Sequence, residues 1–260
     1  MKPELSKKVN ISVEDIDELN LLCYETIADE YGDETHETCR DFDKGTEFFL
    51  LEAINNPICS SLPKGFNYLD VGVGTGVSVQ VLMNWLTEMN AQVDVLDISK
   101  KMLEITEKKF GNKIDNYIHT SIHKFESNKK YDLIVASLCD PYLTESSIKV
   151  YKNILKEDGI LLLTLPTNTW AKSVRKENIQ QTTFHDKHGN KYISYSFCWS
   201  KSDLIKLVES NGLYNYSSRV ILVEEIKEKK PKIGKINNAL LSKGRRIPML
   251  LTLIFLNRPS

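Results

Sequence analysis

The sequence predicts an α/β protein built on a mainly parallel sheet with helices on both faces. From residue 66 onward, short apolar runs alternate with amphipathic stretches at helical spacing. The apolar runs are continuous, as expected for strands that are buried on both faces. The chain has 260 residues, 41% hydrophobic and 27% charged, which is enough apolar material for one domain of this class.

Two helices are expected before the sheet begins. Residues 12–31 start with a serine at a capping position, carry acids in the first turn and then space apolar residues helically. A second amphipathic helix is expected over residues 43–55, where an Asn-Asn-Pro sequence ends it.

Strands and helices then alternate, which is the order that parallel strands require because each pair needs a crossover connection. The helices are expected over residues 76–89, 100–110 and 145–155. The strands are expected over residues 67–74, 92–99, 116–122, 131–138 and 160–166.

The C-terminal third follows another pattern. Residues 182–197 alternate in polarity around a Gly-Asn turn and predict a hairpin. A helix is expected next, ending at Gly212. Two further strands are expected over residues 218–226 and 248–256, separated by a basic segment, residues 227–247, that contains Pro and Gly.

Composition narrows the class of protein. A net charge of −1 provides no overall attraction to nucleic acid or acidic lipid. The five cysteines are scattered without a C-x-x-C pair, which argues against a disulfide framework and a zinc cluster and favours reduced thiols. The N-terminus lacks the apolar core of a secretory signal, and the longest apolar run is too short to span a bilayer. We therefore expect a cytoplasmic protein.

A glycine-rich turn joins the first strand to its helix. Gly72, Gly74 and Gly76 are arranged to bring backbone N–H groups close to a nucleotide-like ligand. A dinucleotide fingerprint would need its last glycine at position 77, which is Val77. Asp70 would repel a pyrophosphate but would suit a ligand with an ammonium and a sulfonium group. The alternative is that the glycines only make a tight turn.

A second acid lies at the end of the next strand. Asp97 follows Gly76 by about twenty residues, where an acid accepts hydrogen bonds from ribose hydroxyls. Dinucleotides and S-adenosylmethionine would both use it, so it indicates an adenosine-type ligand without choosing between them. The alternative is that Asp97 only caps the following helix.

Five segments together resemble the class I S-adenosylmethionine-dependent methyltransferases of small-molecule type. LDVGVGTG, VLDIS, YDLIVASL and LKEDGILLLT are similar to the first, second, fourth and fifth motifs of that family, and YETIADEYGDE to an N-terminal segment that closes over the cofactor. The resemblance implies a Rossmann-like fold with a seven-stranded, mostly parallel sheet, an antiparallel last strand, an N-terminal helical lid and a hairpin insert after strand 5. It also implies S-adenosylmethionine as cofactor, S-adenosylhomocysteine as product and no metal.

We expect a single domain over residues 1–260. Residues 1–60 would form the helical lid, residues 66–165 the cofactor-binding core, and residues 166–260 the acceptor insert and the C-terminal strands.

The resemblance also implies which residues bind the cofactor. The family often has an acid after the third strand that binds the adenine amine, and Ser121 stands in its place here. The implied cofactor residues are Asp70, Gly72, Gly74 and Gly76 at the methionyl part, Asp97 at the ribose, Ile98, Met102, Ser121 and Ile122 at the adenine, Ser137 and Leu138 near the sulfonium, and Tyr24, Tyr31 and Arg40 on the lid.

Methyl transfer from a sulfonium requires alignment and desolvation, with a base only where the nucleophile needs one. Asp140-Pro141-Tyr142 resembles the (D/N)-P-P-(Y/F) motif of amino-group methyltransferases with one proline missing. Asp140, Tyr142 and His36 are the catalytic candidates, although the motif would also suit a turn that begins with proline. Trp170, Arg175 and His185 are candidates for binding the acceptor because they fall in the insert after the fifth strand.

Three functions compete at this point. The leading one is methyl transfer to a nitrogen or oxygen atom of a small molecule, by a monomer or homodimer that binds neither membrane nor nucleic acid. The second is methylation of RNA or protein, with residues 227–247 as a basic arm and salt-dependent binding to RNA as its signature. The third is cofactor binding without catalysis.

Overall fold

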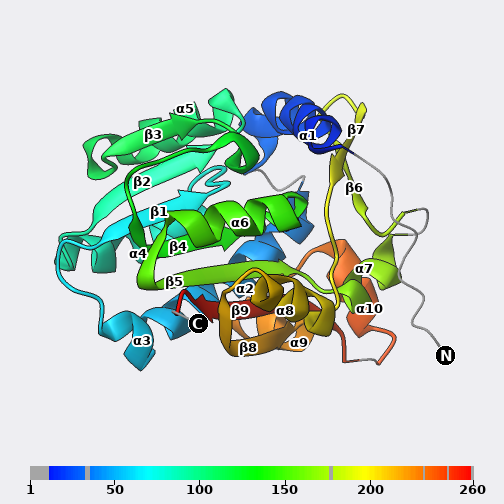
Figure 1. Ribbon diagram of the computed structural model, residues 1–260. Helices are drawn as coiled ribbons and strands as arrows, with labels where there is room; N and C mark the ends of the chain where they lie inside the picture. The colour runs from blue at the N-terminus through cyan, green and yellow to red at the C-terminus, as the bar shows by residue number, and fades with distance from the viewer. Residues whose placement is uncertain (1–11, 33–35, 176–177, 231, 245, 259–260) are drawn as a thin grey trace.

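The computed structural model describes residues 12–32, 36–175, 178–230, 232–244 and 246–258. Its main sheet has the strand order β3-β2-β1-β4-β5-β9-β8, and β9 runs antiparallel to both of its neighbours (Figure 1). The expected seven-stranded sheet with an antiparallel last strand is therefore confirmed. The strands are β1 Asn67–Val71, β2 Gln92–Asp97, β3 Asn116–His119, β4 Tyr131–Ser137, β5 Leu155–Pro166, β8 Tyr214–Leu222 and β9 Pro248–Leu256.

The sheet separates two hydrophobic cores, because successive strand residues point to opposite faces. Leu133 and Val135 of β4 belong to one core, while Ile134 and Ala136 belong to the other. The first core is closed by α2 Glu37–Ile54, α4 Val77–Glu88 and α5 Lys100–Phe110, and the second by α6 Glu145–Ile154 and α8 Lys201–Ser210. Strands covered on both faces account for the continuous apolar runs in the sequence.

The N-terminal helices agree only partly with expectation. Helix α1, Val13–Ile27, begins at Ser12 with a capping box and continues as the short 3₁₀ helix η1, Ala28–Glu30. Figure 1 shows α1 at one end of the sheet, beside α5 and the strand β7. Helix α2 begins at Glu37, earlier than the expected start at Asp43. Its first turns contain the fully buried Asp41, and a buried acid obscures the apolar pattern on which the prediction depended.

The expected hairpin is present as β6 Gln181–His185 paired with β7 Lys191–Tyr195. The expected strand over residues 218–226 is wrong at its end, because β8 stops at Leu222 and α9, Val223–Lys229, follows. Val223 and Ile226 are three residues apart and both enter the first core, so the helical spacing prevails. Two short helices, α3 Pro57–Ser60 and α7 Asn168–Val174, were not expected.

The basic segment after α9 is ordered by a buried carboxylate. Asp41 of α2 pairs with the Lys230 ammonium at 2.7 Å and accepts hydrogen bonds from the Gly234 N–H at 2.9 Å and the Asn237 amide at 2.8 Å. These contacts hold α10, Lys235–Leu241, against α2. Much of the basic segment is therefore packed structure.

Within the described ranges, no helix is both long and apolar enough to cross a bilayer. The longest apolar run of the sequence is β9, which lies between β5 and β8 with nearly every residue buried.

Candidate active site

The loop after β1 requires its glycines. Gly72 and Gly76 have φ of +67° and +81°, in the region that side chains disfavour. A Cβ at Gly72 would lie 2.6 Å from the Cys139 sulfur, and one at Gly76 would lie 2.5 Å from the Phe110 ring. The loop is therefore pressed against the end of β4 on one side and against α5 on the other.

Asp97 ties this loop to the start of α5. One carboxylate oxygen accepts the Gly74 N–H and the other accepts the Ser99 N–H, both at 2.8 Å. The capping residue of α5 is Ser99, whose hydroxyl accepts the Met102 N–H at 3.2 Å. Burial raises the pKa of Asp97 to about 6, although the two N–H donors act in the opposite direction.

Asp70 lies beneath the loop. It is 1% exposed, and one of its oxygens accepts a hydrogen bond from the Tyr68 hydroxyl at 3.2 Å. The other oxygen is buried with no hydrogen-bond partner in the described part of the chain. Burial raises the pKa of Asp70 to about 8, and the neighbouring Asp97 adds to this rise. The site therefore holds a buried carboxylate that cationic charge nearby would stabilise.

A first cavity of about 90 Å³ opens above the glycine loop. It gathers the carboxyl ends of β1, β2, β3 and β4, where ligands bind in open α/β sheets. The expected cofactor residues on its wall are Tyr24, Tyr31, Gly72, Gly74, Asp97, Ile98, Met102, Ser121, Ile122, Ser137 and Leu138. The other three expected cofactor residues do not line the first cavity and lie behind its wall: Asp70, Gly76 and Arg40.

Arg40 and Asp43 form a pair at the edge of the first cavity. The Arg40 guanidinium donates to the Tyr31 carbonyl at 2.8 Å and lies 3.0 Å from the Asp43 carboxylate. Asp43 lines the cavity, and burial raises its pKa to about 6 against the opposing charge of Arg40. Sequence reasoning missed Asp43, although its position one helical turn after Arg40 was a usable signal.

The end of β4 has an uncommon backbone. Leu138 has a φ of +55°, and its N–H donates to the carbonyl of Thr164 at 2.9 Å. A left-handed conformation is costly for leucine, and such conformations cluster at functional sites. The 3₁₀ helix η5, Asp140–Tyr142, follows and places Tyr142 on the wall of the first cavity. The side chain of Asp140 lies outside the described part of the structure.

A second cavity of about 750 Å³ lies between the start of α2, α7 and the hairpin. His36, Trp170, Arg175 and His185 all line it, so the structure brings His36 together with the three expected acceptor residues. Tyr142 lies on the first cavity and not on this one. Tyr24, Tyr31 and Leu138 line both cavities, which therefore adjoin.

An aromatic cluster forms much of the boundary between the cavities. Tyr24, Tyr31, His36 and Phe184 come from α1, the end of η1, the start of α2 and β6. In five of their six possible pairs, the ring centroids lie between 5.6 Å and 6.1 Å apart. Phe184 belongs to the insert after the fifth strand, where an acceptor pocket is expected, and the folded hairpin brings it to α1.

Trp170 and Arg175 also build the wall that they line. The Trp170 indole donates to the Asn237 side chain at 2.9 Å and packs edge-on against Phe42. The Arg175 guanidinium donates to the Ile179 carbonyl at 2.7 Å and to the Ser196 hydroxyl at 2.9 Å. Both side chains thus fix the shape of the second cavity.

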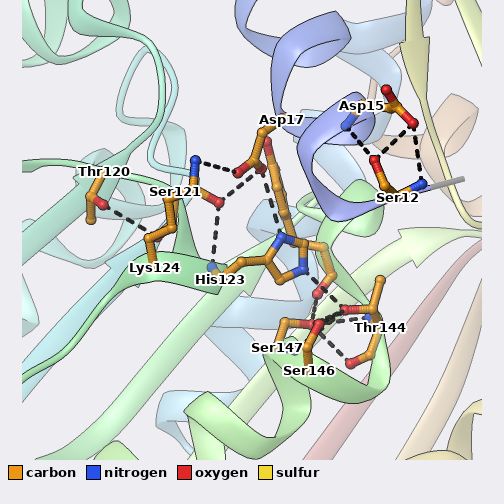
Figure 2. Close-up of polar contacts among 11 residues, drawn as sticks. Ser12, Asp15, Asp17, Thr120, Ser121, His123, Lys124, Thr144, Ser146 and Ser147 are labelled. Carbon is orange, nitrogen blue, oxygen red and sulfur yellow. Dashed lines mark hydrogen bonds and ion pairs between the residues drawn. The ribbon is translucent and has the colours of Figure 1, made fainter.

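A polar network beside the first cavity was not foreseen (Figure 2). Asp17 of α1 accepts a hydrogen bond from Ser121 at 2.8 Å, and His123 and Lys124 lie at 3.7 Å and 3.6 Å from its carboxylate. His119 instead contacts the Ile98 carbonyl at 3.0 Å. No group of three or more His, Cys, Asp or Glu side chains in the described ranges is arranged to hold a metal ion.

Comparison with known proteins agrees with this geometry. Residues 69–159 match the family model described as a methyltransferase domain. Malonyl-[acyl-carrier protein] O-methyltransferase 2 of Ilyobacter polytropus is 32% identical over 100 residues, which cover 37% of this chain and 38% of that protein. Ribosomal RNA small subunit methyltransferase A of Mesomycoplasma hyopneumoniae is 36% identical over 104 residues, 38% of each chain.

The chain thus spans about 38% of the length of each of these two curated relatives. The solved structure of the DhpI-SAH complex aligns over 96% of this chain and 100% of that one, with a TM-score of 0.62 and 13% identity. At that identity the likeness shows the fold.

Proposed function

We propose that the chain is a class I S-adenosylmethionine-dependent methyltransferase and that it transfers a methyl group to a nitrogen or oxygen atom of a small-molecule acceptor, a proposal supported by the matched methyltransferase domain and the shared fold. The observation that carries the proposal is the pair of adjoining cavities that share Tyr24, Tyr31 and Leu138. One cavity would hold the methyl donor and the other the acceptor, so the two reacting groups would meet at this shared wall.

The residues around the first cavity fit S-adenosylmethionine. Both oxygens of Asp97 accept backbone N–H groups, and each retains a lone pair for a ribose hydroxyl. A cationic ligand would favour the ionised form of Asp43 on the wall and of Asp70 beneath it, whereas a pyrophosphate would oppose their ionisation and gain no attraction from either group. When bound, S-adenosylmethionine supplies a methyl group on a good leaving group. The chain then contributes alignment and the exclusion of water.

The second cavity supports a small acceptor. Its volume of about 750 Å³ lies within the roughly 300–1,000 Å³ of small-molecule sites. The aromatic cluster offers apolar contact on one side. Lys191 and Lys235 line the cavity as well, and Glu37 is the only acidic residue on its described wall. We propose that the acceptor carries an apolar or aromatic portion and an anionic group.

The acceptor would be oriented from both sides of the shared wall. Burial raises the pKa of Tyr142 well above its ordinary value, so its hydroxyl serves as a hydrogen-bond donor and not as a base. His36 lines the second cavity and is our candidate for taking a proton where the acceptor requires it. Asp140, which precedes Tyr142 in η5, is proposed to accept a hydrogen bond from the acceptor.

Methylation of RNA is a second candidate, because one of the matched relatives is named a ribosomal RNA methyltransferase. The basic segment, residues 227–247, gives only limited support to RNA binding. Lys230 is paired with the buried Asp41, and the Lys229 ammonium lies 4.6 Å from the Phe48 ring centre. Fewer cations of the segment therefore remain for a phosphate backbone than the sequence suggested.

The proposal is tested by measuring S-adenosylhomocysteine release with panels of small carboxylates, small amines, transfer RNA and ribosomal RNA. Turnover that depends on a carboxylate or an amine supports the proposal. Turnover that depends on RNA and falls steeply with salt would favour the second candidate. Cofactor binding with only slow hydrolysis in every panel would favour binding without catalysis.

A further inference from the structure

Ser121 has a hydrogen-bonding capacity that its surroundings restrict. It follows β3, is 4% exposed and lines the first cavity. Its hydroxyl donates to the Asp17 carboxylate at 2.8 Å and accepts the His123 backbone N–H at 3.3 Å (Figure 2). A hydroxyl has one proton and two lone pairs. With the proton directed at Asp17, Ser121 retains only an acceptor lone pair for a ligand.

The direction of this hydrogen bond is fixed by the charge on Asp17. Asp17 is 5% exposed, and Lys124 and His123 face its carboxylate. Burial is the largest influence on its pKa and raises it, but the interactions with His123, Ser121 and Lys124 together outweigh burial and leave the pKa below its ordinary value. An ionised carboxylate has no proton to donate. Ser121 must therefore be the donor.

We propose that Asp17 is a positioning residue for nucleobase recognition: it holds the Ser121 proton, so that Ser121 accepts a hydrogen bond from a 6-amino purine and rejects a 6-oxo purine. The inference rests on the proposed function: with S-adenosylmethionine in the first cavity and its ribose at Asp97, the adenine would lie against Ser121, which lines the same cavity. A carbonyl oxygen at that position would face a lone pair with no proton between them.

The same network joins the nucleobase site to the rest of the fold. Asp17 is 104 residues away from Ser121 in the sequence and belongs to α1. His123 continues the chain of contacts, because its Nε2 lies 3.0 Å from the hydroxyl of Thr144, the capping residue of α6. Its ring also packs edge-on against Tyr142. Recognition of the base would therefore depend on the docked position of α1.

The test compares S-adenosylhomocysteine with S-inosylhomocysteine by calorimetry on the full chain. We expect the native protein to prefer the adenine ligand by about tenfold or more. In Asp17→Asn the amide can donate to Ser121 and release its proton toward the ligand, so the preference should fall to about threefold or less. Ser121→Ala removes the acceptor and should lower the preference in the same way.

Glu18→Gln is the matched control, because it removes a carboxylate from an exposed position of the same helix and should keep the full preference. Equal weakening of both ligands in Asp17→Asn would show that Asp17 only docks α1 and would overturn the proposal. If Asp17→Asn does not fold, Ser121→Ala decides, and an unchanged preference there overturns the proposal. Failure of the native protein to bind either ligand would instead refute the proposed function.

Discussion

Gly74 donates its backbone N–H to the carboxylate of Asp97 at 2.8 Å, which joins the glycine loop after β1 to the end of β2. The other oxygen of Asp97 accepts the Ser99 N–H, so α5 is fixed to the same carboxylate. The loop, the acid and the helix are therefore one unit. A change at Asp97 alters the ribose contact and the position of the loop together.

Replacing Asp97 by alanine should weaken the affinity for S-adenosylhomocysteine by about 1–3 kcal/mol, because ribose hydroxyls and two backbone N–H groups lose a charged acceptor. Calorimetry measures the change. Asp29→Ala, which removes an exposed carboxylate from η1, is the control and should bind normally. An affinity unchanged in Asp97→Ala would mean that Asp97 serves only the loop.

The cofactor-free protein should lose thermal stability as the pH rises from 5 to 8.5. Burial raises the folded-state pKa of Asp43 and Asp97 to about 6 and that of Asp70 to about 8. A raised pKa contributes stability that is complete below the unfolded pKa and is lost as the pH passes the folded pKa. Melting temperatures across this range measure the effect.

Asp70→Asn is the informative variant for this pH dependence. It removes the carboxylate with the highest pKa of the three, so the decline between pH 6.5 and 8.5 should become smaller. A native melting temperature that rises over the same range would contradict the assignment of buried, protonated carboxyls.

Helix α1 should behave as a lid. The first cavity, at about 90 Å³, is smaller than the roughly 300 Å³ of typical ligand sites. The cofactor therefore enters only when α1 moves outward, and the site closes again once the cofactor is bound. Asn20 holds α1 to the Tyr195 N–H at 2.8 Å, and Glu25 holds it to the Ser99 hydroxyl at 3.0 Å. Hydrogen exchange should show added protection over residues 13–31 when S-adenosylhomocysteine is present. Equal exchange with and without the ligand would argue against a lid.

Asp140→Ala should lower turnover far more than cofactor affinity, because the proposed contact is made with the acceptor in the transition state. Single-acceptor kinetics and calorimetry on the same variant separate the two effects. Glu145→Ala, at an exposed position in the first turn of α6, is the control. Turnover within about a factor of two of the native value would leave Asp140 as a turn residue.

The features that the sequence predicted correctly, the buried strands and the glycine loop, depend on residues that are close together in the sequence. The strands around Leu133 and Leu161 are continuous apolar runs, and the order of strand, Asp70, glycines and helix is typical of a nucleotide-binding turn. Asp17 was missed because it reaches the site only through the packing of α1, whereas Asp43 could have been inferred from its position one helical turn after Arg40. Residues 223–226 were assigned to a strand because they continue the apolar run of β8, although the spacing of Val223 and Ile226 suits the helix that the structure has there.

The fold of the basic segment, residues 227–247, was also not predictable from local sequence. Its many lysines are typical of a solvated loop, and nothing local indicates that the distant Asp41 pairs with Lys230. Periodicity cannot predict these contacts, because α10 is held by the side chain of another helix.

Calorimetric titration of the full chain with S-adenosylhomocysteine and with NAD tests the central claim most directly. Asp70 and Asp43, together with Val77 in place of a third dinucleotide glycine, should favour the thioether nucleoside and disfavour a pyrophosphate. We predict saturable binding of S-adenosylhomocysteine and no measurable binding of NAD. Tight binding of NAD, with no response to S-adenosylhomocysteine, would contradict the account.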